Sequence, residues 1–169
     1  MKYGFIGLGN MAGAIIAGMA ACGKFKNDYL YGFNRSQGKT LALKEKHGLI
    51  PCASAAEVAE KADVIILAVK PQVLPAVLPA LSATLHRSRP LVISIAAGKT
   101  LASLEELLGE GLPLIRVMPN INAKVNESIS AFCGNRLTEE GHKAVVRRIF
   151  EAVGEVIELE EKLFSAFSV

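Results

Sequence analysis

The sequence contains few of the residues that bind metals or form disulfide bonds. Its 169 residues include only three cysteines and three histidines, and none of them forms the short paired spacings of a zinc site or a disulfide framework. They are Cys22, Cys52, Cys133, His47, His86 and His142. We therefore expect no metal, and cysteines that stay reduced in a cytoplasmic location.

A marked excess of charge of either sign is also absent. The chain carries 19 Lys and Arg against 16 Asp and Glu, a formal net charge of +3, and the basic residues are scattered along it. This pattern predicts no nucleic-acid partner and no membrane partner, and it favours an anionic small molecule. With 51% hydrophobic and 21% charged residues, the composition excludes a disordered chain, a collagen and a coiled coil.

One apolar stretch, from Tyr3 to Gly23, has the length of a signal peptide or a membrane span, since Asn10 is its only polar residue. Six glycines within it argue against both, because a glycine costs roughly 1 kcal/mol in a helix interior. The glycines therefore need another explanation.

The spacing of these glycines provides one. Residues 2–6 have the composition of a buried strand, and residues 10–22 that of an apolar helix ending at Gly23. Between them the sequence reads Gly7-Leu8-Gly9-Asn10-Met11-Ala12, the G-x-G-x-x-A form of the dinucleotide-binding fingerprint. Gly7 allows a tight turn, Gly9 lets the backbone approach a pyrophosphate, and Ala12 keeps the helix close to the sheet. The helix N-terminus then faces the phosphates.

The next predicted strand, residues 29–33, indicates which dinucleotide is bound. An NAD site usually follows this strand with Asp or Glu, which binds the ribose 2′-hydroxyl, whereas this chain has Asn34-Arg35-Ser36. Arg35, Ser36 and Lys39 offer a guanidinium, a hydroxyl and further positive charge to a 2′-phosphate. We expect NADP(H), with NAD(H) less favoured. The alternative is that these residues form an ordinary polar turn that caps the following helix.

The rest of the chain alternates between predicted strands and helices without a repeat, linker or low-complexity tract. The further strands are predicted at 49–52, 64–69, 91–95, 114–118, 128–133 and 155–159. The helices are predicted at 37–47, 55–61, 101–108 and 139–150, and Thr100 is the predicted N-cap of the helix at 101–108. A further helix, which follows Lys70-Pro71, should be interrupted or kinked by Pro75 and Pro79. This succession predicts an α/β fold, a Rossmann-type, doubly wound, mainly parallel sheet with helices on both faces. Its ligand crevice should lie outside the carboxyl ends of the strands, at residues 7–11, 34–36, 68–71, 96–98 and 119–122.

Several motifs together resemble one family. They are Gly7-x-Gly9-x-Met11-x-x-Ala14-Ile15-x-x-Gly18, Asn34-Arg35, Leu67-Ala68-Val69-Lys70-Pro71-Gln72, Ser94-Ile95-Ala96-Ala97-Gly98 and Arg116-Val117-Met118-Pro119-Asn120. In order and spacing they are similar to the pyrroline-5-carboxylate reductases, and the resemblance covers essentially the whole chain. It implies NADPH-dependent reduction of 1-pyrroline-5-carboxylate, a cyclic imine carboxylate, to L-proline.

The resemblance also implies which residues bind the cofactor. These are Ile6, Gly7, Leu8, Gly9, Asn10, Met11, Asn34, Arg35, Ser36, Ala68, Val69, Lys70, Pro71, Ala96, Ala97 and Gly98. Catalytic residues stay unassigned, because the family's main substrate contacts belong to a C-terminal helical domain through which its members form homo-oligomers. Lys70 and Asn120 are the candidates within this sequence. We expect a dinucleotide-binding domain over residues 1–162, with residues 163–169 as the start of the helical domain and apolar residues near 163–167 exposed.

The sequence departs from the family pattern at two places. Asn120-Ile121-Asn122 stands where the family has Asn-Thr-Pro, and Ala55 stands where an asparagine is expected. These departures place the substrate-side loop and one cofactor contact in question.

One alternative function is a stand-alone NADP-binding module without catalysis. The other is a β-hydroxyacid dehydrogenase relative, which the stretch from Phe5 to Met11 also resembles, although that family usually has glycine at the position of Ala12.

Overall fold

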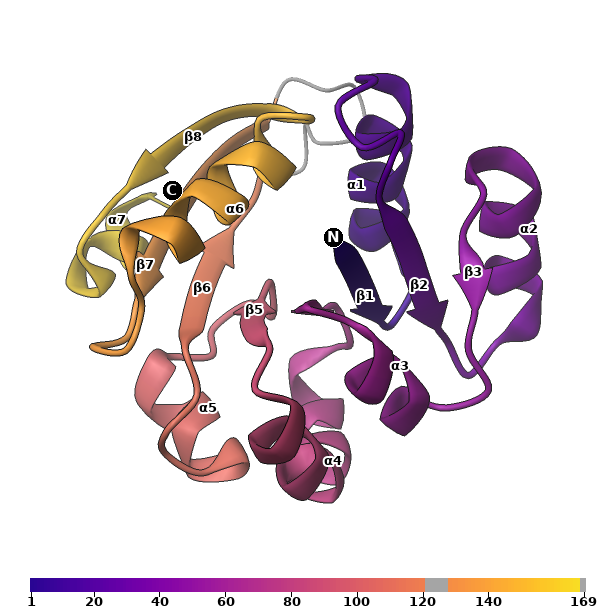
Figure 1. Cartoon of the computed structure of the whole chain (residues 1–169). Coiled ribbons are helices and arrows are strands. Elements are labelled where there is room, and N and C mark those ends of the chain that lie inside the picture. Colours follow the sequence, from indigo (N-terminus) through magenta and orange to yellow (C-terminus); the bar gives the residue numbers. More distant parts are fainter. Residues whose placement is uncertain (121–127, 168–169) are drawn as a thin grey trace.

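A twisted sheet runs through the part of the chain that the computed structural model describes, residues 1–120 and 128–167 (Figure 1). Its strands are β1 (Lys2–Ile6), β2 (Tyr29–Phe33), β3 (Ile50–Pro51), β4 (Val64–Leu67), β5 (Leu91–Ser94), β6 (Leu114–Met118), β7 (Ser128–Gly134) and β8 (Gly154–Glu158). The helices are α1 (Asn10–Ala21), α2 (Gln37–His47), α3 (Ala55–Lys61), α4 (Leu74–Ser88), α5 (Leu101–Leu108), α6 (Glu140–Phe150) and α7 (Phe164–Phe167), with 3₁₀ turns η1 (Pro71–Val73) and η3 (Glu161–Leu163).

The strand order within these residues is β3-β2-β1-β4-β5-β6-β7-β8. All neighbouring pairs are parallel except β6 and β7, so β7 and β8 run opposite to the other strands. The order reverses direction between β1 and β4, which is the switch point where ligands bind in sheets of this kind. The predicted fold class is therefore confirmed.

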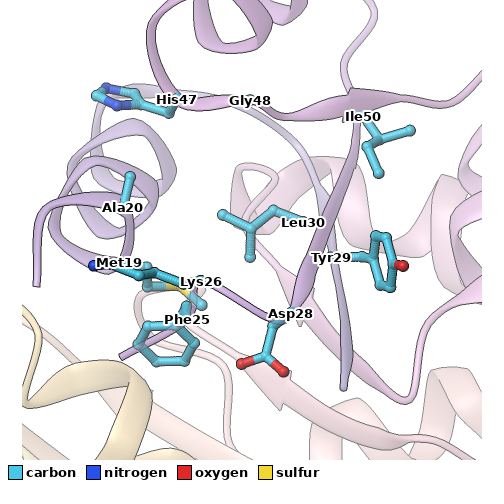
Figure 2. Close-up of a pocket in the computed structure, with 10 residues that line it drawn as sticks. All are labelled: Met19, Ala20, Phe25, Lys26, Asp28, Tyr29, Leu30, His47, Gly48 and Ile50. Atoms are coloured by element: carbon cyan, nitrogen blue, oxygen red, sulfur yellow. The ribbon is translucent and has the colours of Figure 1, made fainter. Parts of the chain in front are cut away.

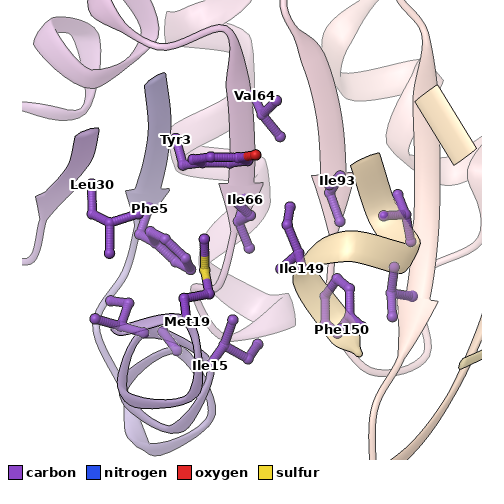
Figure 3. Close-up of a cluster of buried hydrophobic side chains, with 14 of the residues drawn as sticks. Tyr3, Phe5, Ile15, Met19, Leu30, Val64, Ile66, Ile93, Ile149 and Phe150 are labelled. Atoms are coloured by element: carbon purple, nitrogen blue, oxygen red, sulfur yellow. The ribbon is translucent and has the colours of Figure 1, made fainter. Parts of the chain in front are cut away.

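Helices cover both faces of the sheet and enclose two hydrophobic clusters. On one face α1 and α6 pack over the central strands, and Tyr3, Phe5, Ile15, Met19 and Phe150 are fully buried there (Figure 3). On the other face α3, α4 and α5 enclose a second cluster. Because β1, β4 and β5 are covered on both sides, they have the near-continuous apolar sequences typical of central parallel strands.

The predicted helix and strand bounds agree with the structure except at a few ends. The strand predicted over 64–69 ends at Leu67, because the residues from Ala68 onward already belong to the turn at the ligand-binding edge. The strand predicted over 49–52 is only two residues long, at the free edge of the sheet. Thr100 caps α5 as predicted, since its Oγ1 accepts a hydrogen bond of 3.1 Å from the Ser103 amide.

The prediction that proline interrupts the fourth helix is only partly right. The interruption lies before Pro75, where η1 precedes α4, and α4 then continues through Pro79 to Ser88. Pro75 occupies the first turn, where no intrahelical N–H bond is lost. Pro79 removes one interior hydrogen bond, and the buried face of α4, which includes Leu78 and Leu81, holds the helix in place.

Helix α6 is tied to the start of the chain by a cluster of charged groups. Arg148 donates to the Tyr3 hydroxyl (2.9 Å), forms an ion pair of 3.0 Å with Asp28 and lies over the Phe25 ring. Asp28 also accepts from the Met1 ammonium group at 2.8 Å. Burial opposes ionisation of Asp28, but the hydrogen bonds from the Met1 ammonium and Arg148 outweigh it, so the pKa of this carboxyl is lowered.

The segment after β8 packs back onto the sheet. Phe164 is 1% exposed and lies against Ala131 and Cys133 of β7, whereas Leu163 is 45% exposed. The expectation of exposed apolar residues near 163–167 therefore holds for Leu163 and is wrong for Phe164, because the side chains of β7 and the Arg116 guanidinium cover its ring. Ser168 and Val169 lie outside the described residues.

Two glycines of α1 predict opposite effects of the same substitution. A Cβ atom on Gly18 would lie 2.8 Å from the Ala152 carbonyl oxygen and 2.7 Å from Val153 Cγ1, so Gly18→Ala should destabilise the protein by about 1 to 3 kcal/mol. A Cβ atom on Gly13 would have its nearest neighbour at 4.0 Å, so Gly13→Ala should be neutral or stabilising by about 0.5 to 1 kcal/mol. Urea unfolding of both variants tests this, and equal effects would contradict the close packing at Gly18.

The Asp28 cluster predicts a pH dependence of stability. A carboxyl whose pKa is lowered by folding stabilises the protein above its unfolded pKa of about 4, and that stability is lost as the pH falls through the folded pKa. Asp28→Asn should therefore cost about 1 to 2 kcal/mol of unfolding free energy at pH 7 and progressively less below about pH 4. Glu140→Gln is the control, because the Glu140 side chain is 92% exposed. A difference between parent and Asp28→Asn that stays constant down to pH 2 would refute the role of the charge.

Candidate functional site

The carboxyl ends of the central strands lie level with one another. In the parallel ladders Ile6 of β1 pairs with Phe33 of β2 and with Leu67 of β4, Leu67 pairs with Ser94 of β5, and Ser94 pairs with Arg116 of β6. Hydrogen bonds continue just past the strand ends, from the Gly7 amide to the Phe33 carbonyl (2.9 Å) and from the Ala68 amide to the Ile6 carbonyl (2.8 Å). The turns that follow these strands therefore leave the sheet at one edge, as predicted.

The first of these turns brings the β1 backbone against the end of β4. Gly7 has a φ of +95°, and a Cβ atom there would lie 2.8 Å from the Ala68 carbonyl carbon and the Val69 nitrogen. No other residue fits this position without moving the neighbouring strand. A Cβ atom on Gly9 would meet nothing within 4 Å, so Gly9 borders open space.

Helix α1 begins at this open space. Its N-cap, Gly9, has no side chain that could cap the helix, and its first turn contains no acidic residue. The first backbone N–H groups of a helix have no partners within it, and the helix dipole adds partial positive charge at that end. The space beside Gly9 is therefore suited to the phosphates of a dinucleotide.

Asn34 connects this turn to the one after β2. Its side-chain oxygen accepts a hydrogen bond of 3.1 Å from the Leu8 amide, and its Nδ2 donates to the Ser36 carbonyl at 3.2 Å. A single side chain thereby holds the glycine-rich turn and the Asn34-Arg35-Ser36 turn in a fixed relation. Neither interpretation of Asn34 from the sequence, as a cofactor contact or as part of a turn that caps the following helix, predicts this role.

Positive charge lies at the rim of this site. Arg35, Lys39 and Lys70 are exposed, and none of them forms an ion pair with any residue in ranges 1–120 and 128–167. The Ser36 side chain does not cap α2, although Ser36 stands at the N-cap position. The alternative interpretation of these residues as a capping turn therefore lacks the hydrogen bond on which it depends.

A cavity of about 240 Å³ joins three of the predicted turns. It is lined by Ile6, Gly7, Leu8, Gly9, Phe33, Asn34, Arg35, Lys39, Ala55, Ala68, Val69, Lys70, Val73 and Val77. Ala55, Val73 and Val77 form an apolar wall of this cavity, and the sequence did not predict Val73 and Val77 as part of a site. Val73 and Val77 are separated by one helical turn and so lie on the same side. This spacing could identify them as part of the site only once it is known which face of α4 packs against the protein. Ala55 lies in this wall, so the departure from the family pattern falls within the site.

A second cavity, of about 760 Å³, adjoins the turn after β5. Ala97, Gly98 and Thr100 line it together with Arg116, Met118, Glu161, Lys162, Phe164 and Ser165. The structure thus divides the predicted cofactor residues between two cavities at the same edge. Asn10, Met11, Ser36, Pro71 and Ala96 belong to the same turns but line neither of them.

The two candidate catalytic residues differ in how the structure places them. Lys70 is exposed at the first cavity, and its carbonyl accepts a hydrogen bond from the Val73 amide at the start of η1. Asn120 is half-buried after β6. Ile121 and Asn122, which carry the other departure from the family pattern, lie outside the described residues.

A further cleft of about 260 Å³ lies at the amino-terminal end of β2 (Figure 2). Phe25, Asp28, Tyr29, Leu30 and His47 are among its lining residues. The Asp28 carboxylate in this cleft is already bound by Arg148 and the Met1 ammonium group. The turns with the dinucleotide fingerprint lie at the other end of the strands, so we assign the site to the carboxyl edge.

The described residues contain no group of three or more His, Cys, Asp or Glu side chains placed to hold a metal ion. Across ranges 1–120 and 128–167, no helix has both the length and the apolar composition needed to span a bilayer.

The fold and the glycine-rich turn define the dinucleotide-binding class of α/β proteins. A family model described as "NADP oxidoreductase coenzyme F420-dependent" matches residues 2–98. The chain is 38% identical to the pyrroline-5-carboxylate reductase of Escherichia coli (strain K12) over 162 residues, which are 96% of this chain and 60% of that protein. The chain therefore belongs to this oxidoreductase family and, within it, groups with the pyrroline-5-carboxylate reductases.

Solved structures show the same relation. A pyrroline-5-carboxylate reductase from Coxiella burnetii matches with a TM-score of 0.92 and 33% identity over 98% of this chain and 62% of that one. The Plasmodium falciparum enzyme with NADP bound matches with a TM-score of 0.83 and 31% identity over 97% of this chain and 59% of that one. The predicted family is confirmed. The chain spans about 60% of the length of the curated relatives.

The two glycines of the turn predict separable effects on stability and binding. Gly9→Ala should lower the unfolding free energy by no more than about 1 kcal/mol, because the new methyl group meets no protein atom and only the weaker N-cap preference of alanine counts against it. The methyl group should weaken dinucleotide binding by about tenfold or more, because it occupies the phosphate space. Gly7→Ala should instead destabilise the fold by about 2 kcal/mol or more. Urea unfolding and fluorescence titration with NADPH measure both effects, and unchanged binding by Gly9→Ala would contradict this placement of the phosphates.

Proposed function

We propose that this chain is the NADP(H)-binding part of a pyrroline-5-carboxylate reductase, which reduces 1-pyrroline-5-carboxylate to L-proline. The similarity of 96% of the chain to such a reductase, at 38% identity, is the observation that carries this proposal. The structure supports it, because the shared motifs fall in the turns along one edge of the sheet.

The chemistry places modest demands on this part of the protein. A protonated cyclic imine is already a strong electrophile, and a bound NADPH supplies the hydride. The protein has to orient the two reactants, bind the substrate carboxylate and exclude water. The described turns at residues 6–11, 34–36, 68–71 and 96–98 contain no His, Asp or Glu, as expected for a site without an elaborate acid–base set.

The residues of this chain favour NADP(H) over NAD(H). Arg35 and Lys39 line the first cavity without ion-pair partners among the described residues, and the uncapped α1 N-terminus lies beside Gly9. The turn after β2 presents no carboxylate to a 2′-phosphate. The similar Plasmodium falciparum enzyme was solved with NADP bound, which agrees with this preference.

The remaining parts of the proposal concern the whole protein. We propose residues 1–162 as the dinucleotide-binding domain and residues 163–169 as the start of a helical domain that supplies substrate contacts and forms a homo-oligomer. Lys70 and Asn120 remain the candidate catalytic residues of this chain. A cytoplasmic location is supported by the three cysteines, all of which are free.

The stand-alone module is the alternative from a different functional class. It predicts that the 169-residue chain binds NADPH but never turns over 1-pyrroline-5-carboxylate, even when the rest of a related reductase is supplied as a second polypeptide. An assay of NADPH oxidation with and without that polypeptide separates the two proposals. Turnover in either case supports the reductase.

Substitution of Arg35 tests the cofactor preference. The parent chain should bind NADPH more tightly than NADH, and Arg35→Ala should remove most of that difference, about 10- to 100-fold, because a charge-assisted hydrogen bond to the 2′-phosphate is lost. Arg87→Ala is the matched control, since Arg87 is an exposed arginine in the last turn of α4. Calorimetric titration with both cofactors measures the ratio. Equal affinity of the parent for the two would contradict the proposed role of residues 34–36.

A further inference from the structure

Glu161 joins the segment after β8 to the first turn of α5. Its Oε2 accepts a hydrogen bond of 2.8 Å from the Leu101 amide and one of 3.2 Å from Arg116 Nη1. Leu101 is the first residue of α5, and its amide has no partner within the helix. A carboxylate 60 residues further along the chain therefore provides part of the N-terminal capping of α5.

The other partner of Glu161 cannot easily move. Arg116 is 7% exposed within β6, and its guanidinium lies 4.6 Å from the centre of the Phe164 ring. Phe164 in turn is buried against Ala131 and Cys133. Burial, and to a smaller extent the Glu161 carboxylate, raise the pKa of the Cys133 thiol to about 12, so this neighbour stays neutral at physiological pH. Glu161 is the charged partner of a buried guanidinium, and among the described residues its removal leaves that charge without an ion pair.

The loop between β5 and α5 is attached at both ends by these contacts. At its start the Ala96 amide donates to the buried Ser94 hydroxyl at 3.3 Å. At its end the Leu101 amide donates to Glu161, while the Thr100 side chain is engaged with the Ser103 amide. Between these points Ala97 and Gly98 are exposed and line the second cavity. Glu161 thus supplies one of the hydrogen bonds that hold the ends of this loop.

We propose that Glu161 is a positioning residue for the cofactor: it holds the Ala97–Gly98 turn against the far end of the dinucleotide, away from the Arg35 end. This inference rests on the proposed function, since it requires a bound NADP(H). It assigns the segment after β8 a role in cofactor binding through the loop, without contact between Glu161 and the cofactor.

Two ligands separate this role from a general loss of structure. NADPH would extend along both parts of the edge, whereas adenosine 2′,5′-bisphosphate contains only the part that lies beside Gly9 and Arg35. Glu161→Ala should weaken NADPH binding by roughly three- to tenfold and leave the affinity for adenosine 2′,5′-bisphosphate unchanged. Arg35→Ala should weaken the binding of both ligands. The readout is the ratio of the two dissociation constants, which a uniform destabilisation of the fold would not alter.

Glu161→Gln and Glu160→Gln are the matched variants. Glutamine retains an acceptor for the Leu101 amide but lacks the charge, so Glu161→Gln should keep part of the NADPH affinity that Glu161→Ala loses. If Glu161→Ala does not fold, Glu161→Gln takes its place in the test. Glu160 is the preceding residue, and within ranges 1–120 and 128–167 its side chain forms an ion pair only with the exposed Lys162. Glu160→Gln should leave both affinities unchanged.

Amide hydrogen exchange tests the loop directly and without ligand. Glu161→Ala should speed exchange at the Leu101 amide more than at the Ser103 amide, which Thr100 still holds. The inference is overturned if the parent binds both ligands and Glu161→Ala leaves both the affinity ratio and the Leu101 exchange rate unchanged. If the parent binds neither ligand, the proposed function is itself wrong, and the positioning role of Glu161 is then wrong as well.

Discussion

The close contact between the ends of β1 and β4 at Gly7 is the constraint on which the site depends. The backbone leaves β1 with a φ of +95° and passes so near Ala68 and Val69 that no Cβ atom fits between the two strands. Since the strand ends are level, this contact places the N-terminus of α1 at the common edge, from which the helix packs back over one face of the sheet. A wider separation would move the uncapped amides of the helix away from the turns of the neighbouring strands.

Polar contacts between the turns complete this arrangement. Asn34 holds the glycine-rich turn through the Leu8 amide and its own turn through the Ser36 carbonyl. The side chain that follows β2 is thus used within the protein, whereas the exposed side chains of Arg35 and Lys39 line the first cavity. A carboxylate at position 34 would accept the Leu8 hydrogen bond equally well, but it would add negative charge where a 2′-phosphate is expected. An amide at this position therefore serves both the fold and the preference for NADP(H).

Features set by local sequence were predictable, and features set by distant contacts were not. Strands such as β1 and β2 and the turn from Gly7 to Ala12 follow from short patterns of apolar residues and glycine, and their predicted bounds agree with the structure. The apolar wall that includes Val77 depends on which face of α4 packs against the sheet. Glu161 and Leu101 are 60 residues apart in the sequence, and no local sequence pattern predicts the contact between them. The helix through Pro79 was mispredicted for the same reason, because the packing of its buried face outweighs a local penalty.

The reversal of direction at β7 explains how a residue so late in the chain reaches the site. β7 runs antiparallel to β6, and β8 runs parallel to β7, so β8 approaches from the carboxyl edge and ends where Glu158 pairs with Phe132. Phe132 lies opposite Val117, next to Arg116, and Arg116 is level with the last residue of β5. The turn after β8 consequently lies beside the loop that follows β5. A longer β8 would carry Glu161 toward the opposite edge of the sheet, and neither Arg116 nor the α5 N-terminus would then have this carboxylate as its partner.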